Sequence, residues 1–344
     1  MAMRDHLRQL TLCLPSHRPL SAARSSIESL LRFGEETGCR MVISDNSGDP
    51  EKREAFEGRS PHLIYLVPEG DDPLDNLTTA LSAVETEFVM PMGDDDWIRT
   101  GEGVALPDLS TIAPDVAVIR PETEIWAEGR VVDINRFTID GSSAEARMLD
   151  YVRKAPATNA LYYSAFRSGI FLPLMQSFAA GHPTRGGYCD WAVMFTLLAC
   201  GRAIHAPGIL YRYDLGRWTS SVSLQESKRS LFAAAGLPAE AENYSALLTF
   251  LDLYTLLSIR ALPLGAQERD QALGASLSVS LGAFVAAVRA RPCDYDEVAV
   301  YLTELLAEET ELNGIFALAL MIADCLQPGL RERYVRFFQA VSAG

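Results

Sequence analysis

Three consecutive aspartates, Asp94, Asp95 and Asp96, directly follow an apolar run at residues 88–92 that predicts a buried strand. Carboxylates seldom gather beside a protein core unless a cation compensates their charge. Carboxylate oxygens are the ligands that Mg²⁺ and Mn²⁺ prefer, and such an ion can bridge to the oxygens of a nucleotide diphosphate. Taken alone, the triplet fits an acidic turn of an acidic protein. The sequence upstream of it favours a site for Mn²⁺ or Mg²⁺.

The charge balance limits the classes of partner. The chain has 344 residues, of which 48% are hydrophobic and 22% charged, a composition typical of a globular protein with one large domain or two ordinary ones. Its 30 basic and 45 acidic residues give a net charge of −15, and no cluster of Lys or Arg interrupts the sequence. Nucleic acids and anionic membranes attract concentrated positive charge, so we expect no nucleic-acid partner.

Cysteine usage and the start of the chain bear on the compartment. The six cysteines are scattered without paired spacing, which favours reduced thiols in a cytoplasmic protein. The first residues lack the apolar segment of a signal peptide. An uncharged run at residues 272–288 is rich in Gly, Ser and Ala and somewhat short, which favours a packed internal helix. We expect no transmembrane segment, and peripheral contact with a membrane stays open.

Strand and helix patterns alternate through the first hundred residues. Strand-like runs at 10–14, 40–44, 63–67 and 88–92 are separated by helix-like segments at 21–33, from about 51, and at 74–84. Such alternation predicts a mostly parallel sheet covered by helices on both faces. Ligands of these sheets collect outside the carboxyl ends of the strands, where Asp45 and the aspartate triplet are expected to lie.

The pattern changes after Trp97. Short strands are expected at 116–119, 124–126 and 131–134, then a helix from Asp190 to Cys200, and extended segments near Ile204 and at 209–213. From residue 224 onward only helical spacing remains. We therefore predict an α/β domain over residues 1–223, with a nucleotide-binding half at 8–100 and an acceptor-side half at 101–223. An all-helical module follows at 224–344, and its leucine-rich faces either form its own core or pair two copies into a homodimer.

Four segments appear in an order that resembles a known family. They are Leu-Pro-Ser-His-Arg-Pro at 14–19, Ser-Asp-Asn-Ser-Gly-Asp at 44–49, Asp-Asn at 75–76 and Gly-Asp-Asp-Asp-Trp at 93–97. Each is weak alone, but their shared order resembles the nucleotide-binding half of GT-A fold glycosyltransferases, most closely the family-2-like group. The resemblance covers residues 8–100 well and 155–222 more loosely. It implies the GT-A fold and an inverting transfer from a nucleotide-sugar.

The resemblance also implies roles for residues in the first half. The loop after the first strand would line the nucleoside pocket with Pro15, Ser16, His17 and Arg18. Asp45 would accept the imide N–H of a base, usually uracil, although the same residues also suit an ordinary turn. Asn76 matches an asparagine often found on the following helix, and a surface role is equally open. The aspartate triplet would hold the metal and diphosphate and contact the donor sugar, and spacing does not decide which of the three aspartates bind the metal.

In the second half, the resemblance assigns the acceptor side. Asp190, at the start of an apolar helix, would be the catalytic base, because an inverting transfer needs a carboxylate to take the proton of the acceptor hydroxyl. An aspartate stabilised by the helix dipole is the alternative. Asp214 occupies the position of a histidine that often completes the metal site. Arg217 would pair with the diphosphate and Trp218 would stack on a sugar, or both would be ordinary surface and packing residues.

The sequence therefore predicts a metal-dependent glycosyltransferase that uses a nucleotide-sugar, in particular a UDP-sugar, and a hydroxyl of a glycan, lipid-linked saccharide or protein. A non-catalytic scaffold that retains this fold is one alternative. A nucleotidyltransferase is another, although the glycine-rich loop and downstream lysine of that class are missing from the first loop. The sugar and the acceptor are not encoded in any recognisable motif.

Overall fold

The computed structural model describes residues 7–155, 159–216 and 221–343. Contacts divide the chain into two compact units. The first unit contains residues 1–140, 160–175 and 201–216, and the second contains 141–159, 176–200 and 217–344. This division differs from the expected boundary at residue 224. The reason is that α4 (Ala144–Lys154) and α6 (Asp190–Cys200) pack against each other and against later helices.

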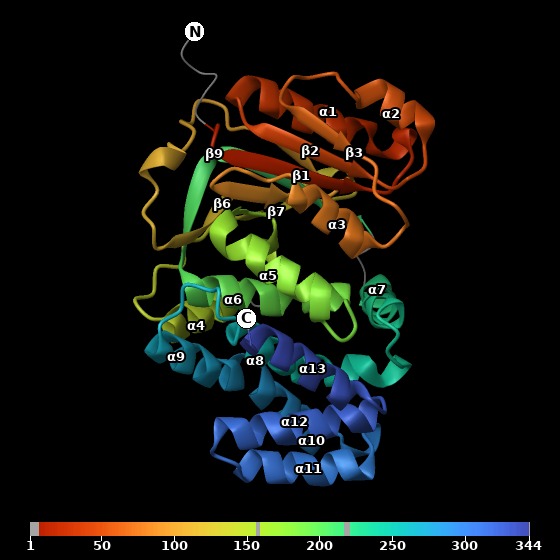
Figure 1. Cartoon of the computed structure of the whole chain (residues 1–344), viewed down its shortest axis with the longest axis vertical. Helices are drawn as coiled ribbons and strands as arrows, with labels where there is room; N and C mark the ends of the chain where they lie inside the picture. The colour runs from red at the N-terminus through yellow and green to blue at the C-terminus, as the bar shows by residue number, and fades with distance from the viewer. Residues whose placement is uncertain (1–6, 156–158, 217–220, 344) are drawn as a thin grey trace. The chain divides into compact units, whose positions relative to one another are not determined.

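The first unit begins with four parallel strands in the order β3-β2-β1-β4. These are β1 (Leu10–Ser16), β2 (Arg40–Asp45), β3 (Leu63–Leu66) and β4 (Phe88–Pro91), and Figure 1 shows the first three side by side. Helices α1 (Leu20–Thr37), α2 (Pro50–Phe56) and α3 (Pro73–Ser82) connect them. The register places Ser16 opposite Asp45, so the loops after β1 and β2 start side by side at the carboxyl edge.

The sheet continues beyond β4 in a mixed arrangement, in the order β8-β6-β9-β5. The strands are β5 (Trp97–Thr100), β6 (Val116–Ala127), β8 (Ala165–Arg167) and β9 (Arg202–Asp214), and β7 (Arg130–Asn135) pairs with β6. The two strands expected at 116–119 and 124–126 are one long strand with local register shifts. Because β9 pairs with both β5 and β6, its end is brought back to the segment that follows β4.

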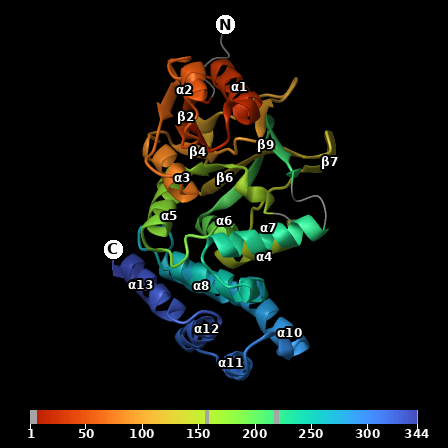
Figure 2. The same cartoon turned by 90° about the vertical axis from the view of Figure 1, so that its right-hand side faces the viewer.

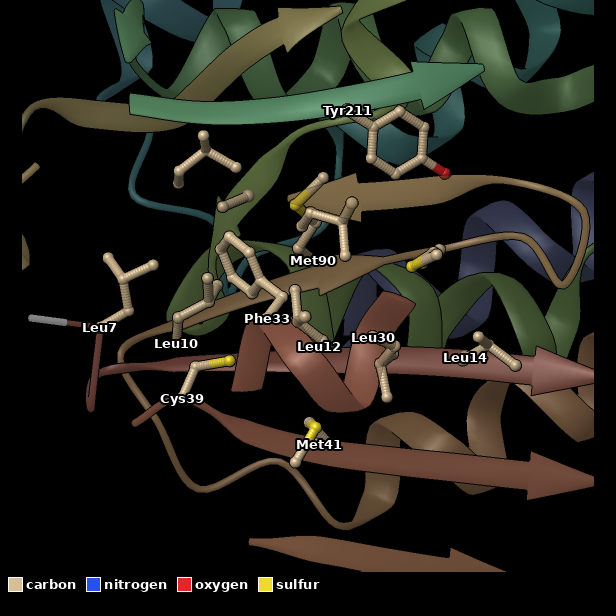
Figure 3. Close-up of a cluster of buried hydrophobic side chains, with 14 of the residues drawn as sticks. Leu7, Leu10, Leu12, Leu14, Leu30, Phe33, Cys39, Met41, Met90 and Tyr211 are labelled. Atoms are coloured by element: carbon tan, nitrogen blue, oxygen red, sulfur yellow. The ribbon is translucent and has the colours of Figure 1, made fainter. Parts of the chain in front are cut away.

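The core of the first unit lies between α1 and the sheet. Figure 3 shows side chains of β1, β2 and α1 meeting there, including Leu12, Leu30, Phe33 and Met41. Helix α1 carries buried residues at helical spacing, and Gly34 lets it approach β2 closely. A Cβ at Gly34 would lie 2.3 Å from the sulfur of Met41. This contact fixes α1 against the strands whose ends carry the polar loops.

The second unit is helical throughout its described residues. Besides α4 and α6, it contains α7, α8, α9, α10, α11, α12 and α13, and it takes the last part of α5 (Ser168–Gly181). Their bounds are α7 (Ser221–Ala234), α8 (Ser245–Leu257), α9 (Ala266–Ser276), α10 (Gly282–Ala290), α11 (Glu297–Glu308), α12 (Leu312–Leu326) and α13 (Leu330–Ala343). Helix α8 is buried on nearly all sides, and α11, α12 and α13 pack in sequence (Figure 2).

A π-helical segment, Leu277–Leu281, joins α9 to α10. The continuous helical stretch 266–290 that results is long and apolar enough to cross a membrane by length and composition, a test that buried helices of other proteins also pass. The predicted fold class, an α/β domain with a largely parallel sheet followed by a helical C-terminal region, is confirmed.

Candidate active site

Asp94 anchors the loop that follows β1. Its Oδ2 accepts hydrogen bonds from Ser16 Oγ at 2.8 Å, from the backbone N–H of His17 at 3.1 Å and from that of Arg18 at 3.0 Å. The Arg18 Nε lies 3.1 Å from Asp94 Oδ1. With only 4% of its surface exposed, Asp94 ties the β1 loop to the aspartate triplet. Its role as a metal ligand stays a prediction. The contacts of Asp94 in this structure hold the loop that follows β1.

Asp95 and Asp96 bring their carboxylates together over Gly93. A Cβ placed on Gly93 would lie 2.9 Å from Asp95 Oδ1 and 2.8 Å from Asp96 Oδ2. A side chain at residue 93 would therefore collide with both carboxylates, and glycine lets them approach the backbone of the turn. The Ser26 hydroxyl in α1 is within hydrogen-bond distance of the carbonyls of Gly93, at 3.1 Å, and Asp96, at 2.6 Å, which fixes this turn. The Asp95 side chain is 43% exposed, so this carboxylate is open to a ligand.

Asp96 points toward the last strand. Its Oδ2 accepts the hydroxyl of Tyr211 at 2.6 Å, and its Oδ1 accepts the backbone N–H of Asp214 at 3.2 Å. Burial raises the pKa of Asp96 to about 7, because the charged form loses water. The structure places the backbone of Asp214 beside Asp96, with the Asp214 side chain exposed to solvent. Metal binding by Asp214 stays a prediction.

Asp45 is buried at the end of β2, with 4% of its surface exposed. Its Oδ1 accepts from Lys52 Nζ at 2.8 Å and from the Ser47 N–H at 3.1 Å, and its Oδ2 accepts from the Tyr65 hydroxyl at 2.5 Å. Burial would raise the pKa of Asp45, but the hydrogen bonds from Lys52 and Tyr65 outweigh it, so the pKa is lowered. Asp45 is thus ionised and already accepts hydrogen bonds within the protein. Recognition of a nucleotide base by Asp45 stays a prediction.

Lys52 is the residue that sequence reasoning missed. Its side chain is completely buried, and its ammonium reaches Ser16 Oγ at 2.6 Å, the Arg18 carbonyl at 2.9 Å and Asp45 Oδ1 at 2.8 Å. These three acceptors match the three donors of an ammonium group. A signal was present, since this is one of only three lysines in the chain and lies seven residues after Asp45, at the start of a helix.

Asn76 joins the same set of loops. It is 3% exposed, and its Nδ2 donates to the Ser16 carbonyl at 3.1 Å and to Asn46 Oδ1 at 3.0 Å. The amide therefore holds α3 to the ends of β1 and β2. Pro15 pairs with Ser44 in the sheet and immediately precedes Ser16. The His17 side chain is largely exposed beside Asp94.

The charges of this region do not cancel. The carboxylates Asp45, Asp94, Asp95 and Asp96 face two cations, Arg18 and Lys52, so two negative charges are left over when all four are ionised. Arg18 reaches Asp95 at 2.5 Å as well as Asp94. An excess of this size, next to converging carboxylate oxygens, is what a divalent cation compensates.

Asp190 belongs to the second unit, at the first residue of α6. It is half-buried, and its Oδ1 accepts the Trp191 N–H at 2.8 Å. Burial raises the pKa of Asp190 to about 6, and the Asn159 amide partly offsets that rise. The Tyr151 hydroxyl lies 2.6 Å from Asn159 Oδ1, which orients this amide. A carboxyl with a pKa near 6 suits a general base at neutral pH. The remaining predicted residues, Arg217 and Trp218, lie outside the described residues.

A second group of possible metal ligands occurs in the second unit. Donor atoms of His182, Cys189 and Asp252 lie within 4.8 Å of one another, and all three residues are buried. However, His182 Nδ1 accepts the Arg185 N–H at 2.9 Å, so the ring proton is on Nε2, which lies 2.8 Å from Asp252 Oδ1. The Tyr334 hydroxyl donates to the same oxygen at 2.8 Å. Nε2 therefore has no lone pair for a metal, and the group is a hydrogen-bonded core.

Comparison with known proteins gives structural matches only. No protein-family model matches the chain, and no curated protein matches it. The structure matches GT-A glycosyltransferases over nearly the whole chain. Residues 1–349 of S. aureus TarS match at 13% identity over 90% of both chains, with a TM-score of 0.44. The same TarS fragment in complex with UDP-GlcNAc matches at 13% identity over 97% of this chain and 90% of that one, with a TM-score of 0.41.

A mannosyltransferase, PcManGT from Pyrobaculum calidifontis in complex with GDP-Man and Mn²⁺, matches at 15% identity over 99% of this chain and 88% of that one, with a TM-score of 0.41. Identities and TM-scores this low carry no argument about the activity of this chain. The function proposed below therefore depends on the geometry of the site.

Replacing Lys52 tests the buried ion pair. The variant Lys52→Met removes the cation that pairs with Asp45 among the described residues and leaves the Asp45 charge buried. We therefore expect a loss of about 3–5 kcal/mol in the free energy of unfolding, measured by urea titration. Arg53→Met is the matched control, because Arg53 is exposed and its ion pair within the described part of the chain is with Glu57, the residue just after α2. Equal stability of the two variants would contradict the structural role given to Lys52.

Proposed function

We propose that this chain is a metal-dependent, inverting glycosyltransferase that uses a UDP-sugar as its donor. The observation that carries the proposal is the convergence of Asp95 and Asp96 over Gly93, at the carboxyl edge of the parallel strands. Edges of this kind are where α/β folds bind their ligands. The acceptor in this proposal is a hydroxyl of a glycan-type molecule.

The carboxylates fit a divalent cation. Asp95 and Asp96 would hold Mn²⁺ or Mg²⁺ through hard oxygen ligands, and Asp214, whose backbone N–H contacts Asp96, would be a third ligand. When bound, such a cation would neutralise the negative charge of the diphosphate that leaves as the glycosidic bond breaks. Asp94 contributes indirectly, since it holds His17 and Arg18 beside this region.

The chain's own residues would orient the donor. The His17 side chain and the Arg18 guanidinium are accessible next to the triplet, where both can pair with phosphate oxygens. Among the described residues, Asp45 Oδ2 accepts one hydrogen bond, from the Tyr65 hydroxyl, so an imide N–H of uracil could share or displace that donor. This is the physical basis for preferring a uridine nucleotide.

On the acceptor side, Asp190 would act as the base. Its ionised carboxylate would take the proton of the acceptor hydroxyl while the hydroxyl oxygen attacks the anomeric carbon from the face opposite the leaving diphosphate. A proton then resides on Asp190, and the configuration of the sugar is inverted. The pKa of about 6 keeps most of this group ionised at pH 7 and lets it return its proton to solvent.

Ligand-dependent stability tests the metal and nucleotide site. Mn²⁺ together with UDP should raise the unfolding free energy by about 2.7 kcal/mol at a concentration one hundred times the Kd. Asp95→Asn and Asp96→Asn should reduce this gain, whereas Asp71→Asn, an exposed aspartate outside the site, should keep it. Differential scanning calorimetry provides the measurement. Stabilisation by nucleoside triphosphates alone would favour a nucleotidyltransferase. If no nucleotide stabilises the protein, the scaffold is favoured.

Asp190→Asn tests the base. We expect the variant to lower the rate of sugar transfer by about 10²–10⁴-fold, measured as UDP release from a panel of UDP-sugars with glycan acceptors, while UDP binding with Mn²⁺ stays unchanged. In the wild type only the ionised form works, so activity should fall about tenfold per pH unit below pH 6. Asp270→Asn, an exposed aspartate of α9, serves as control. Full activity of Asp190→Asn would remove this residue as the base.

A further inference from the structure

The second unit contains a cavity of about 370 Å³. Its walls come from α4, α6, the start of α8, and the π-helical segment with α10. A volume of this size is in the range of small-molecule sites. The site predicted from the sequence includes none of its lining residues, so the cavity is a feature that the proposed catalytic residues do not explain.

One wall of the cavity is apolar and built mainly from small side chains. Ala155, just after α4, and Ala283 and Ala287 on α10 leave the space that larger residues would fill, and Phe195 on α6 also lines the cavity. The π-helical segment Leu277–Leu281 contributes as well, and π-helical turns are frequent at functional sites because they displace side chains from regular helical positions. This wall accommodates an apolar group.

The lining also has a polar wall, and four of its residues come from one short stretch. Glu242, Asn243, Ser245 and Thr249 offer a carboxylate, an amide and two hydroxyls. Glu242 has an ion-pair contact with Arg229 at 3.6 Å. The cavity lining contains no Lys, Arg or His. This wall therefore suits uncharged hydroxyl groups and disfavours a phosphate or carboxylate.

Trp191 lies in the cavity wall and is held in place by its neighbours. Its ring centroid is 5.6 Å from that of Tyr151 and 5.8 Å from that of Phe195. A half-buried indole offers a flat apolar face with a polar N–H at its edge, which matches a sugar ring that has C–H groups on one face and hydroxyls around it. Trp191 directly follows Asp190 in the sequence, whereas the cavity lining from α6 consists of Trp191 and Phe195.

We propose that this cavity binds a glycoside with an apolar aglycone. The sugar ring lies against Trp191 with its hydroxyls toward residues 242–249, and the aglycone lies among the alanines at the end of α4 and on α10. This ligand site goes beyond the proposed transferase function and does not depend on it.

Binding of octyl β-D-glucopyranoside below its critical micelle concentration tests this inference. Isothermal titration calorimetry on the full chain without nucleotide should show binding, and saturation-transfer NMR should show contact with both sugar and alkyl protons. Ala283→Leu, which fills the cavity, should weaken binding at least tenfold. Ala286→Leu, on the same helix but outside the lining, should leave the affinity unchanged.

Two results would overturn the inference. Octan-1-ol binding as tightly as the glycoside would make the cavity a purely apolar site, and equal affinity of the Ala283→Leu variant would place the glycoside elsewhere. Asn243→Ala provides a second check, because it should weaken binding of the glycoside and leave binding of octan-1-ol unchanged. Mn²⁺–UDP binding on the same preparations reports separately on the proposed function, so a failure of that function is distinguishable from a failure of the cavity.

Discussion

The buried ammonium of Lys52 is the interaction on which the first unit's site depends. It connects the ends of β1 and β2 by binding Asp45, Ser16 and the Arg18 carbonyl at once. Ser16 in turn donates a hydrogen bond to Asp94, which also accepts the backbone N–H of His17 in the loop after β1. A lone buried charge of either sign would be costly, so the two ionised groups keep each other and the loops between them in place.

This network also explains why the aspartate triplet is not uniform. Asp94 binds the loop after β1, whereas Asp95 and Asp96 both lie close to Gly93. Hydrogen bonds from Tyr211 and the Asp214 backbone keep Asp96 turned inward. The three residues therefore have three different environments despite being adjacent in the sequence. The protein's own cations leave part of the negative charge uncompensated, and this remainder is the physical argument for a metal ion.

Local sequence patterns predict the structural features that depend on residues near one another in the chain. The alternation of strands and helices follows from apolar spacing, and the position of Asp45 and the triplet at the carboxyl edge follows from the order of elements. Contacts between distant residues are not predictable in this way. Lys52 bonds to Ser16, Ser26 to Asp96 and Tyr211 to Asp96 only because register and helix packing bring them together. The grouping of α4 and α6 with the C-terminal helices likewise depends on apolar faces that match in three dimensions.

The most direct test of the account is a crystal structure with Mn²⁺ and UDP, with anomalous diffraction recorded at the manganese edge. The account predicts one strong anomalous peak within coordination distance of Asp95 and Asp96 oxygens, bridging to the diphosphate. A diphosphate bound without manganese at these carboxylates, or a peak far from the turn at Gly93, would contradict it.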